Sequence, residues 1–327
     1  MSAASPTVSV ALCTYQGQAY VHEQLASIAA QTLPPQEVVI CDDGSTDATV
    51  DVITAFIATY TGPIAFRLLD TTRVGGVVPN FSRALAACTG ELIALSDQDD
   101  VWHPDRLAAA VPAFADASLL LLNADATLVD GAGAPLGDTL LSTLYASAAD
   151  LARFHAREGF ALLLARNTVT GATTLLRRTL LEDALPIPPH WVHDEWLALL
   201  AAARGGHDTL ERAVIDYRLH GGNQIGATAP TLRHKLRQVF SPRGNRLTVL
   251  AERAALAVER LEGMDVPPEV LDLARRKLAF DGRRAAYPAA RRRRLAPLWR
   301  EWRRGDYPAL ASQGRMDLLR DLLQPGA

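Results

Sequence analysis

The 327-residue sequence predicts an α/β fold in which a mainly parallel sheet is flanked by helices and followed by a helical extension. Two observations lead to this prediction. Short apolar and β-branched runs alternate with segments of helical periodicity through the first 130 residues, as they do in successive βαβ units. Beyond residue 230 this alternation gives way to Arg-rich segments with helical periodicity.

The alternation defines the expected elements in order. Strands are expected at 7–15, 37–43, 64–70, 91–97 and 118–129, with helices between them at 22–32, 45–60, 80–90 and 103–117. After residue 140 the pattern weakens to a strand over 168–178, a helix over 193–206 and a strand over 213–223. Tail helices are expected at 248–263, 267–280 and 295–305. The connector "GATAP" places a boundary between a domain at 1–227 and a basic, helical C-terminal region at 228–327.

The composition is that of a globular protein of a reducing compartment. Hydrophobic residues make up 49% of the chain and charged residues 21%, which suffices for a sizeable core. The longest apolar runs fall short of the ~20 residues that span a bilayer, and the N-terminus does not resemble a signal peptide. The three cysteines are odd in number and form no C-x-x-C pair, which favours free thiols. We therefore expect a cytoplasmic protein.

The net charge of −3 conceals a division between the two parts of the chain. Residues 1–227 hold 12 Lys and Arg against 25 Asp and Glu, whereas residues 228–327 hold 21 against 11. Such asymmetry indicates different partners for the two parts.

Two acidic clusters directly follow expected strands. Ligands of parallel sheets bind beyond the carboxyl ends of the strands, where "CDDGSTD" and "SDQDD" both fall. Each cluster has a local structural interpretation, as a turn at Gly44 in the first and as a helix start in the second. The functional interpretation is that Asp43 accepts the ring N–H of a uracil or thymine and that "SDQDD" holds a divalent cation.

Two further motifs lie in the less regular part. In "WVHDEWLAL", Asp194 can cap a helix or act as a general base, and His193 can be a packing residue. In "YRLHGGNQIG", His220 is either an ordinary loop residue or one nitrogen ligand among the oxygen ligands of Mn²⁺.

Taken together and in order, these motifs closely resemble glycosyltransferase family 2. The resemblance extends over about residues 7–226 and includes "VVPNFSRALAACTG" and "TGATTLLRR" besides the clusters above. It is nearest to the bacterial rhamnosyltransferase-like branch, in which a D-Q-D-D-x-W block is usual. It implies a GT-A fold, a nucleotide-sugar donor, a Mg²⁺ or Mn²⁺ ion, and transfer with inversion at the anomeric carbon.

The resemblance also implies roles for individual residues. Asp194 corresponds to the catalytic base, and His220 to a metal ligand on a loop that closes over the diphosphate. The residues that it places at the donor or the metal are Thr14 and Tyr15 in the pocket for the nucleotide base, Asp43 on the pyrimidine, Asp97 and Gln98 near the ribose or sugar, Asp97 and Asp99 at the metal, and Gly171 and Ala172 at the floor of the sugar and acceptor pocket. One departure is that Arg73 and Val74 stand where members often carry an Asn, so no donor contact is carried over to that loop.

The leading hypothesis is a transferase that uses dTDP-L-rhamnose to extend a surface polysaccharide on a glycan or lipid-linked acceptor. UDP-galactofuranose, UDP-glucose and GDP-mannose are the rival donors. The alternative from another class is a non-catalytic nucleotide-sugar-binding or scaffold protein of an assembly complex. A nucleotidyltransferase is disfavoured because "CTYQGQAY" lacks the cationic, Gly-rich loop that would follow its first strand.

The basic tail has two interpretations. "RRRRL" and "WREWRRG" can be solvated surface helices, or they can contact an anionic membrane, which Arg and Trp favour. Nucleic acid is not expected as a partner because the tail contains no recognisable binding motif.

Overall fold

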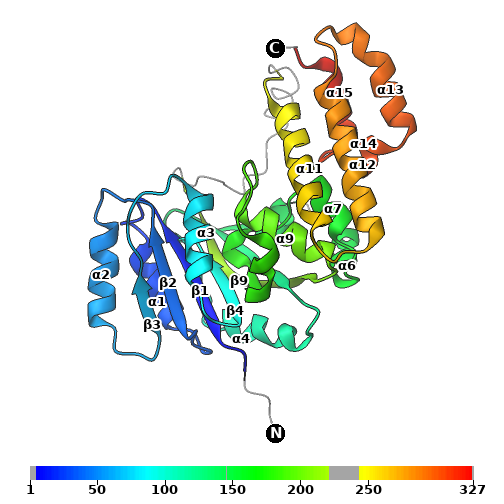
Figure 1. Ribbon diagram of the computed structural model, residues 1–327. Helices are drawn as coiled ribbons and strands as arrows, with labels where there is room; N and C mark the ends of the chain where they lie inside the picture. Colours follow the sequence, from blue (N-terminus) through cyan, green and yellow to red (C-terminus); the bar gives the residue numbers. More distant parts are fainter. Residues whose placement is uncertain (1–4, 145, 221–242, 326–327) are drawn as a thin grey trace.

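The computed structural model describes residues 5–144, 146–220 and 243–325 (Figure 1). Its centre is a nine-stranded mixed sheet with the strand order β3-β2-β1-β4-β8-β6-β9-β5, and β7 pairs with β6 outside this order. The strands are β1 Val8–Thr14, β2 Glu37–Asp42, β3 Ala65–Leu68, β4 Leu92–Ser96, β5 Val101–Trp102, β6 Leu121–Asp130, β7 Pro135–Thr139, β8 Leu175–Arg177 and β9 His207–Leu219. The predicted α/β class with a mainly parallel sheet is therefore confirmed.

The parallel part of the sheet carries the N-terminal motifs. β1 pairs in parallel with β2 and β4, and β2 pairs in parallel with β3. Side chains of β1 alternate between the two faces: Val10 and Leu12 join one apolar cluster, while Ala11 and Cys13 join the other. All four are buried because helices cover both faces, which is why these strands read as continuous apolar runs.

The helices of the sheet domain form two layers. α1 and α2 pack on one face of the sheet, and α3 and α9 pack on the other. Up to the end of the sheet domain the α-helices are α1 Val21–Ala29, α2 Thr49–Thr59, α3 Val77–Ala87, α4 Arg106–Ala110, α5 Leu140–Thr143, α6 Ala148–His155, α7 Phe160–Ala165, α8 Leu181–Ala184 and α9 His193–Ala203.

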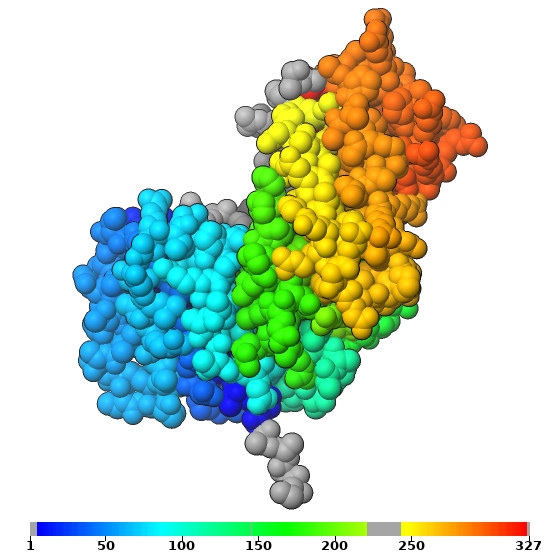
Figure 2. All heavy atoms as spheres, in the orientation of Figure 1, coloured from blue at the N-terminus to red at the C-terminus, as the bar shows by residue number. Residues whose placement is uncertain are grey.

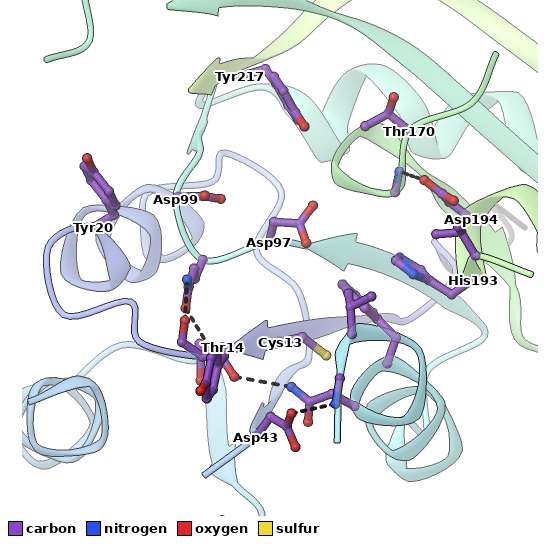
Figure 3. A pocket seen from close by; sticks show the side chains of 18 of the residues that line it. Cys13, Thr14, Tyr20, Asp43, Asp97, Asp99, Thr170, His193, Asp194 and Tyr217 are labelled. Atoms are coloured by element: carbon purple, nitrogen blue, oxygen red, sulfur yellow. Dashed lines mark hydrogen bonds between the residues drawn. The ribbon is translucent and has the colours of Figure 1, made fainter. Parts of the chain in front are cut away.

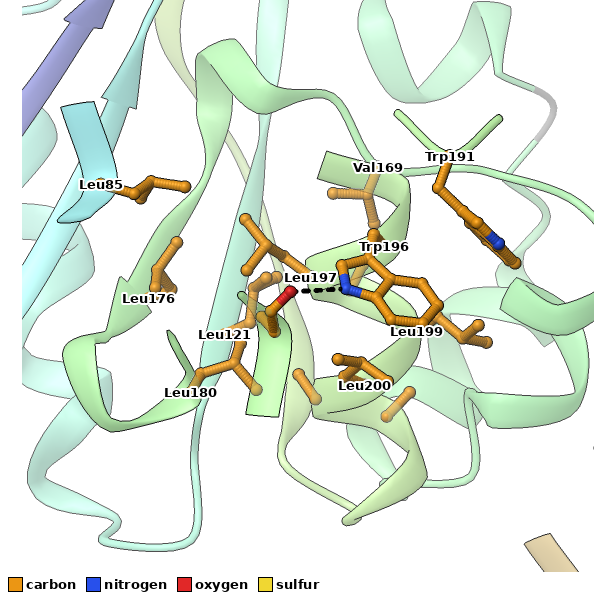
Figure 4. Packing of buried hydrophobic residues seen from close by; sticks show 14 of the residues in the cluster. Leu85, Leu121, Val169, Leu176, Leu180, Trp191, Trp196, Leu197, Leu199 and Leu200 are labelled. Atoms are coloured by element: carbon orange, nitrogen blue, oxygen red, sulfur yellow. Dashed lines mark hydrogen bonds between the residues drawn. The ribbon is translucent and has the colours of Figure 1, made fainter. Parts of the chain in front are cut away.

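Helix α9 is the most deeply buried helix in the part of the chain that the structure describes. Every residue from His193 to Ala203 except Glu195 is buried. Figure 4 shows Trp196 at the centre of this packing, where its indole N–H donates to the Ala184 carbonyl at 2.9 Å. The small Ala side chains at the end of α9 let the helix lie close to the sheet.

Several expected elements differ in the structure, and β9, expected over 213–223, already begins at His207. The helix expected over 103–117 is α-helical only in α4 and continues as a 3-10 helix at Val111–Ala115, because Pro112 has no N–H for the helical ladder. The strand expected over 168–178 shrinks to β8, because Gly171–Thr173 turns as a 3-10 helix instead.

The C-terminal region is a separate helical layer that packs on the sheet domain. It consists of α11 Arg246–Glu262, α12 Pro268–Ala285, the 3-10 turn Arg291–Arg294, α13 Leu295–Arg303, α14 Asp306–Leu310 and α15 Arg315–Leu323. Figure 2 shows these helices as a lobe that projects beyond the sheet domain. α11 and α12 share the apolar cluster of α9 through Ala257, Val258, Leu261 and Ala274.

The interior of this lobe is held by buried ion pairs as well as apolar contacts. Asp321 is fully buried and accepts from Arg284 at 2.6 Å and from Arg246 at 2.8 Å. No helix within the described ranges combines the length and the hydrophobicity that a membrane crossing needs. The predicted domain boundary at 227/228 lies outside the described residues and stays a prediction.

Candidate active site

A pocket of about 440 Å³ opens at the carboxyl ends of β1, β2 and β4 (Figure 3). All of the predicted site residues line it except Ala172, which is 1% exposed and belongs to the apolar core beneath. The predicted residues in the pocket wall are Thr14, Tyr15, Asp43, Asp97, Gln98, Asp99, Gly171, Asp194 and His220. The sheet thus brings together motifs that lie up to about 200 residues apart in the chain.

The last residue of β2, Asp42, and the residue after it, Asp43, have different roles. Asp42 closes the turn: it accepts from the Thr14 hydroxyl at 2.7 Å and from the Ser45 N–H at 2.7 Å. Gly44 has a φ of 75°, which this tight turn requires. Asp43 instead faces the pocket.

Asp43 is held by the loop that precedes α3. Its carboxylate accepts the backbone N–H groups of Val74, Gly75 and Gly76 at 2.6, 2.9 and 2.7 Å. Burial raises the pKa of Asp43, but these three hydrogen bonds and the nearby Arg73 outweigh it, so the pKa lies below its ordinary value. A carboxylate has about four acceptor positions, which leaves about one for the ring N–H of a pyrimidine.

Gln98 joins the first strand to the acidic loop. Its amide oxygen accepts from the Tyr15 N–H at 2.8 Å, and its amide nitrogen donates to the Tyr15 carbonyl at 2.9 Å. A Cβ at Gly17 would lie 2.1 Å from the Gln98 amide oxygen, so a side chain at this position would displace the Gln98 amide from Tyr15. The pairing makes Gln98 a support for Tyr15 as well as part of the pocket wall.

The three carboxylates of "SDQDD" point in different directions. Asp97 faces the pocket, where burial and the charges of Asp99 and Asp194 raise its pKa to about 7. Asp99 contacts His220, whose Nε2 lies 2.7 Å from the Asp99 Oδ2. Asp100 turns inward and accepts from the Arg218 N–H at 3.1 Å, and burial with its acidic neighbours raises its pKa well above the ordinary value.

The oxygen ligands of this cluster suit a hard divalent cation, but the side chains are not arranged as a complete metal-binding site. Among the described residues, no three Asp, Glu, His or Cys side chains lie close enough together to hold a metal ion. Burial and the like charges of Asp99 and Asp194 nevertheless raise the pKa of Asp97 against the effect of Arg106, and a bound cation would lower this pKa. The donors are carboxylate oxygens and one imidazole, a set that suits Mg²⁺ or Mn²⁺.

Asp194 stands at the first turn of α9, across the pocket from the acidic loop. Its carboxylate accepts the Gly171 N–H at 2.9 Å and the Glu195 N–H at 2.6 Å. Burial raises the pKa of Asp194 to about 6 against the effect of these hydrogen bonds. A carboxylate that is fixed in place and titrates near neutrality has the properties of a general base.

The pocket also contains residues to which the sequence motifs assigned no role. The Tyr20 ring lies against the His220 ring at a tilt of 31° with centroids 4.8 Å apart, and Asn80 donates to the Cys41 carbonyl at 2.9 Å. Asn80 and Phe81 are the "NF" of a quoted motif, so their position could be found from the sequence but not their contacts. The Arg73 guanidinium lies 5.8 Å from the centroid of the Tyr15 ring, so a positive charge lies beside the expected pocket for the nucleotide base.

Solved structures share this architecture. Staphylococcus aureus TarS (residues 1–349) in complex with UDP-GlcNAc superposes with a TM-score of 0.56 and 19% identity, covering 96% of this chain and 89% of that one. The mannosyltransferase PcManGT from Pyrobaculum calidifontis, in complex with GDP-Man and Mn²⁺, gives 0.54 and 21%, covering 97% and 86%. At these identities the likeness establishes the fold, and the expected GT-A type is confirmed.

Sequence relatives point the same way. An uncharacterized glycosyltransferase of Nostoc sp. is 30% identical over 220 residues, which cover 66% of each chain. A Shigella flexneri protein named dTDP-rhamnosyl transferase RfbG is 34% identical over 103 residues, or 31% of this chain and 35% of that protein. This chain therefore spans no more than about two thirds of the length of these relatives. The model of the family described as "Glycosyl transferase family 2" matches residues 9–185, more than half of the chain, so the chain belongs to glycosyltransferase family 2.

Proposed function

We propose that this enzyme transfers a sugar from a dTDP- or UDP-sugar to a hydroxyl of a glycan or lipid-linked acceptor, with inversion, in surface polysaccharide synthesis. The observation that carries the proposal is the position of Asp194, a carboxylate with a raised pKa of about 6 that faces the acidic loop across one pocket. An inverting transfer needs one base on the acceptor side and compensation of charge on the diphosphate side.

The chemistry follows from this division. Asp194 takes the proton of the acceptor hydroxyl while the hydroxyl oxygen bonds to the anomeric carbon. The bond from that carbon to the diphosphate oxygen breaks in the same displacement, and the nucleoside diphosphate leaves with the electron pair. A Mg²⁺ or Mn²⁺ ion held through Asp99 and His220, with Asp97 beside them, would neutralise the diphosphate as a Lewis acid.

L-Rhamnose from dTDP-L-rhamnose is our first choice of donor. Its support is the D-Q-D-D-x-W block and the partial relative in Shigella flexneri that bears the name of a dTDP-rhamnosyl transferase. Asp43, with about one acceptor position left, suits the ring N–H of thymine or uracil. UDP-galactofuranose, UDP-glucose and GDP-mannose are the donors to test beside it.

Calorimetric titration with dTDP, UDP and GDP, each with and without Mn²⁺, tests this proposal. We expect dTDP or UDP to bind tightly only in the presence of the metal. The Asp99→Ala variant should lose this metal-dependent binding. The nucleotide that binds more tightly then determines which sugar nucleotides are used in a transfer assay. Failure of all three nucleotides to bind under any condition would refute the transferase proposal and favour a scaffold role.

We also propose that the protein is cytoplasmic and that its C-terminal lobe contacts an anionic membrane. Of the large apolar side chains that are exposed in the described residues, most lie on α13 and α15, and these are Leu295, Trp299, Met316 and Leu319. Leu295 and Trp299 are one helical turn apart and are 58% and 60% exposed.

The charges of the lobe support this partner. From residue 281 to 325 every acidic side chain is buried, namely Asp281, Glu301, Asp306, Asp317 and Asp321. The exposed charges around α13 and the start of α15 are all basic, and they are Arg291, Arg292, Arg293, Arg300, Arg303, Arg304 and Arg315. Arg304 pairs with Glu301 at 3.0 Å, and the surface that combines Trp, Leu and the remaining Arg side chains fits the interface of an anionic bilayer, where each Arg contributes about 1 kcal/mol.

Sedimentation with vesicles tests the membrane contact. We expect binding to phosphatidylcholine vesicles that contain phosphatidylglycerol and little binding to phosphatidylcholine alone. The double variant Leu295→Ser, Trp299→Ser should lose most of this binding. Leu136→Ser is the matched control because Leu136 is 48% exposed on β7, outside the lobe. Equal sedimentation of both variants would contradict the proposed face.

A further inference from the structure

His193 is a buried imidazole in the pocket wall, and its nitrogens are left without partners. The residue is 4% exposed and lines the pocket beside Asp194. Its ring lies face to face on Phe81, with centroids 3.9 Å apart and planes at 14°. In the part of the chain that the structure describes, neither His193 nitrogen has a hydrogen-bond partner.

This state differs from that of the other buried histidine on the same side of the sheet. His207 is 2% exposed and also packs on a phenylalanine ring, but its Nε2 lies 2.8 Å from the Asn123 amide oxygen. His207 is thus tied into the protein through one nitrogen, and it does not line the pocket. Both His193 nitrogens are themselves buried, and buried polar groups are normally hydrogen-bonded, so these two unpaired atoms point to a partner that the described chain does not supply.

The protonation state limits what that partner can be. Burial lowers the pKa of His193 to about 3, so the imidazole is neutral at physiological pH. A neutral imidazole offers one donor and one acceptor, which matches a hydroxyl group better than an anionic diphosphate. The stacking on Phe81 fixes the plane of the ring and therefore the directions of both hydrogen bonds.

The His193 ring lies at the end of the pocket where Asp194 would act. A Cβ built on Gly171 would lie 2.8 Å from the His193 Nε2 and 3.6 Å from the Asp194 Cβ. The imidazole edge therefore faces the same glycine whose N–H holds the Asp194 carboxylate. Figure 3 shows His193 and Asp194 together on one side of the pocket, with Tyr20 and Asp99 on the other.

We propose that His193 binds a sugar hydroxyl at the reacting end of the pocket, with one nitrogen donating and the other available to accept. This inference rests on the proposed function, because it assumes that a sugar occupies the space next to Asp194. The hydroxyl can belong to the donor sugar or to the acceptor, and the two sources give different results in the test below. In either case His193 orients a reactant and does not take the proton that Asp194 takes.

The test uses His193→Phe, which keeps an aromatic ring against Phe81 but removes both hydrogen-bonding groups. His193→Gln, which places an amide near the Nε2 position, is the rescue variant, and His193→Leu replaces His193→Phe if the larger ring is not accommodated. Removing an unpaired buried polar group should leave the melting temperature of the free protein equal to or above that of the wild type. A purely structural role would lower it.

Calorimetry in the presence of Mn²⁺ then compares dTDP with dTDP-L-rhamnose, and UDP with UDP-glucose, on each variant. If His193 binds the donor sugar, His193→Phe should weaken the affinity for the sugar nucleotide about 5- to 10-fold and the affinity for the bare nucleotide less than twofold. If His193 binds the acceptor, the affinities for both ligands should be unchanged, and the KM for the acceptor should rise about 5- to 10-fold. His193→Gln should recover part of either loss.

The outcomes separate this inference from the proposed function. If the wild type binds no nucleotide, both are wrong. If the wild type binds and transfers normally, and His193→Phe changes neither the sugar nucleotide affinity nor the acceptor KM by more than twofold, only the role of His193 is refuted. An equal loss of affinity for the nucleotide and the sugar nucleotide would also refute it, because the substitution would then affect contacts to the nucleotide and not to the sugar.

Discussion

The ion pair between Glu195 and Arg253 connects the C-terminal lobe to the first turn of α9, next to Asp194. Arg253 Nη2 lies 2.5 Å from Glu195 Oε1, and the two side chains are 22% and 12% exposed. The Arg253 guanidinium also lies 4.1 Å from the centroid of the Trp191 ring, and its backbone carbonyl accepts from the Trp191 indole at 3.2 Å. One arginine of α11 thus supports both the loop that leads into α9 and the residue that follows the proposed base.

Arg253→Met should destabilise the protein because it leaves Glu195 buried without its partner. Burial already raises the pKa of Glu195, and Arg253 opposes this rise. Removing one partner of a buried pair costs about 3–5 kcal/mol, and the residual exposure of Arg253 reduces our expectation to about 2–4 kcal/mol. Glu195→Gln in the same background should restore about half, which gives a coupling energy above about 1 kcal/mol.

Urea unfolding of the two single variants and the double variant measures this coupling, with tryptophan fluorescence as the signal. Arg275→Met is the matched control: Arg275 lies 2.7 Å from Glu262, but both side chains are about half exposed, at 52% and 48%. Such a surface pair contributes about 0–1 kcal/mol. A loss in Arg253→Met no larger than in Arg275→Met, or a coupling energy near zero, would refute the reasoning.

Three further predictions concern the pocket. Gly171→Ala should lower the transfer rate by about 100-fold, because its Cβ would lie 2.8 Å from the His193 Nε2 and the ring is held against Phe81; steady-state kinetics on the folded variant checks this. Asp97, with a pKa raised to about 7, binds its proton more tightly in the folded than in the unfolded chain, so stability in the absence of metal should fall as the pH rises from about 4 to about 7. Asp97→Asn should therefore raise the melting temperature at pH 8 by about 2 °C or more, and a variant that melts lower would contradict this. The kcat/KM of transfer should rise about tenfold per pH unit below about pH 6 and level off above it, as Asp194 ionises; a profile that is flat between pH 5 and 7 would exclude it as the base.

The parallel half of the fold could be predicted because each strand there is a short apolar run that ends in polar residues. That rule placed Thr14, Asp43 and Asp97 at one sheet edge before the structure was known, and the pocket lies there. The rest of the sheet, in which β6 pairs in parallel with β9 and antiparallel with β8, could be predicted only in part. β5 has two residues and β8 has three, too few for a period to be recognised.

Other features depend on contacts between distant parts of the chain, which no local pattern encodes. Asp42 and Asp43 are indistinguishable in the sequence, yet one closes a turn and the other faces the pocket. The pairing of Gln98 with the Tyr15 backbone spans 83 residues. The Arg-rich tail could be recognised as helical and basic, but the burial of all its acids from Asp281 onward could not be foreseen.

The central claim is that Asp194 is the base of a sugar transfer in this pocket, and Asp194→Asn tests it most directly. The substitution keeps the size of the side chain and one acceptor oxygen, so nucleotide affinity with Mn²⁺ should stay within about twofold of the wild type. With the donor that the titration selects, the transfer rate should fall about 10²- to 10⁴-fold, the usual contribution of a general base. A variant that binds nucleotide normally and still transfers sugar within about threefold of the wild-type rate would contradict the account.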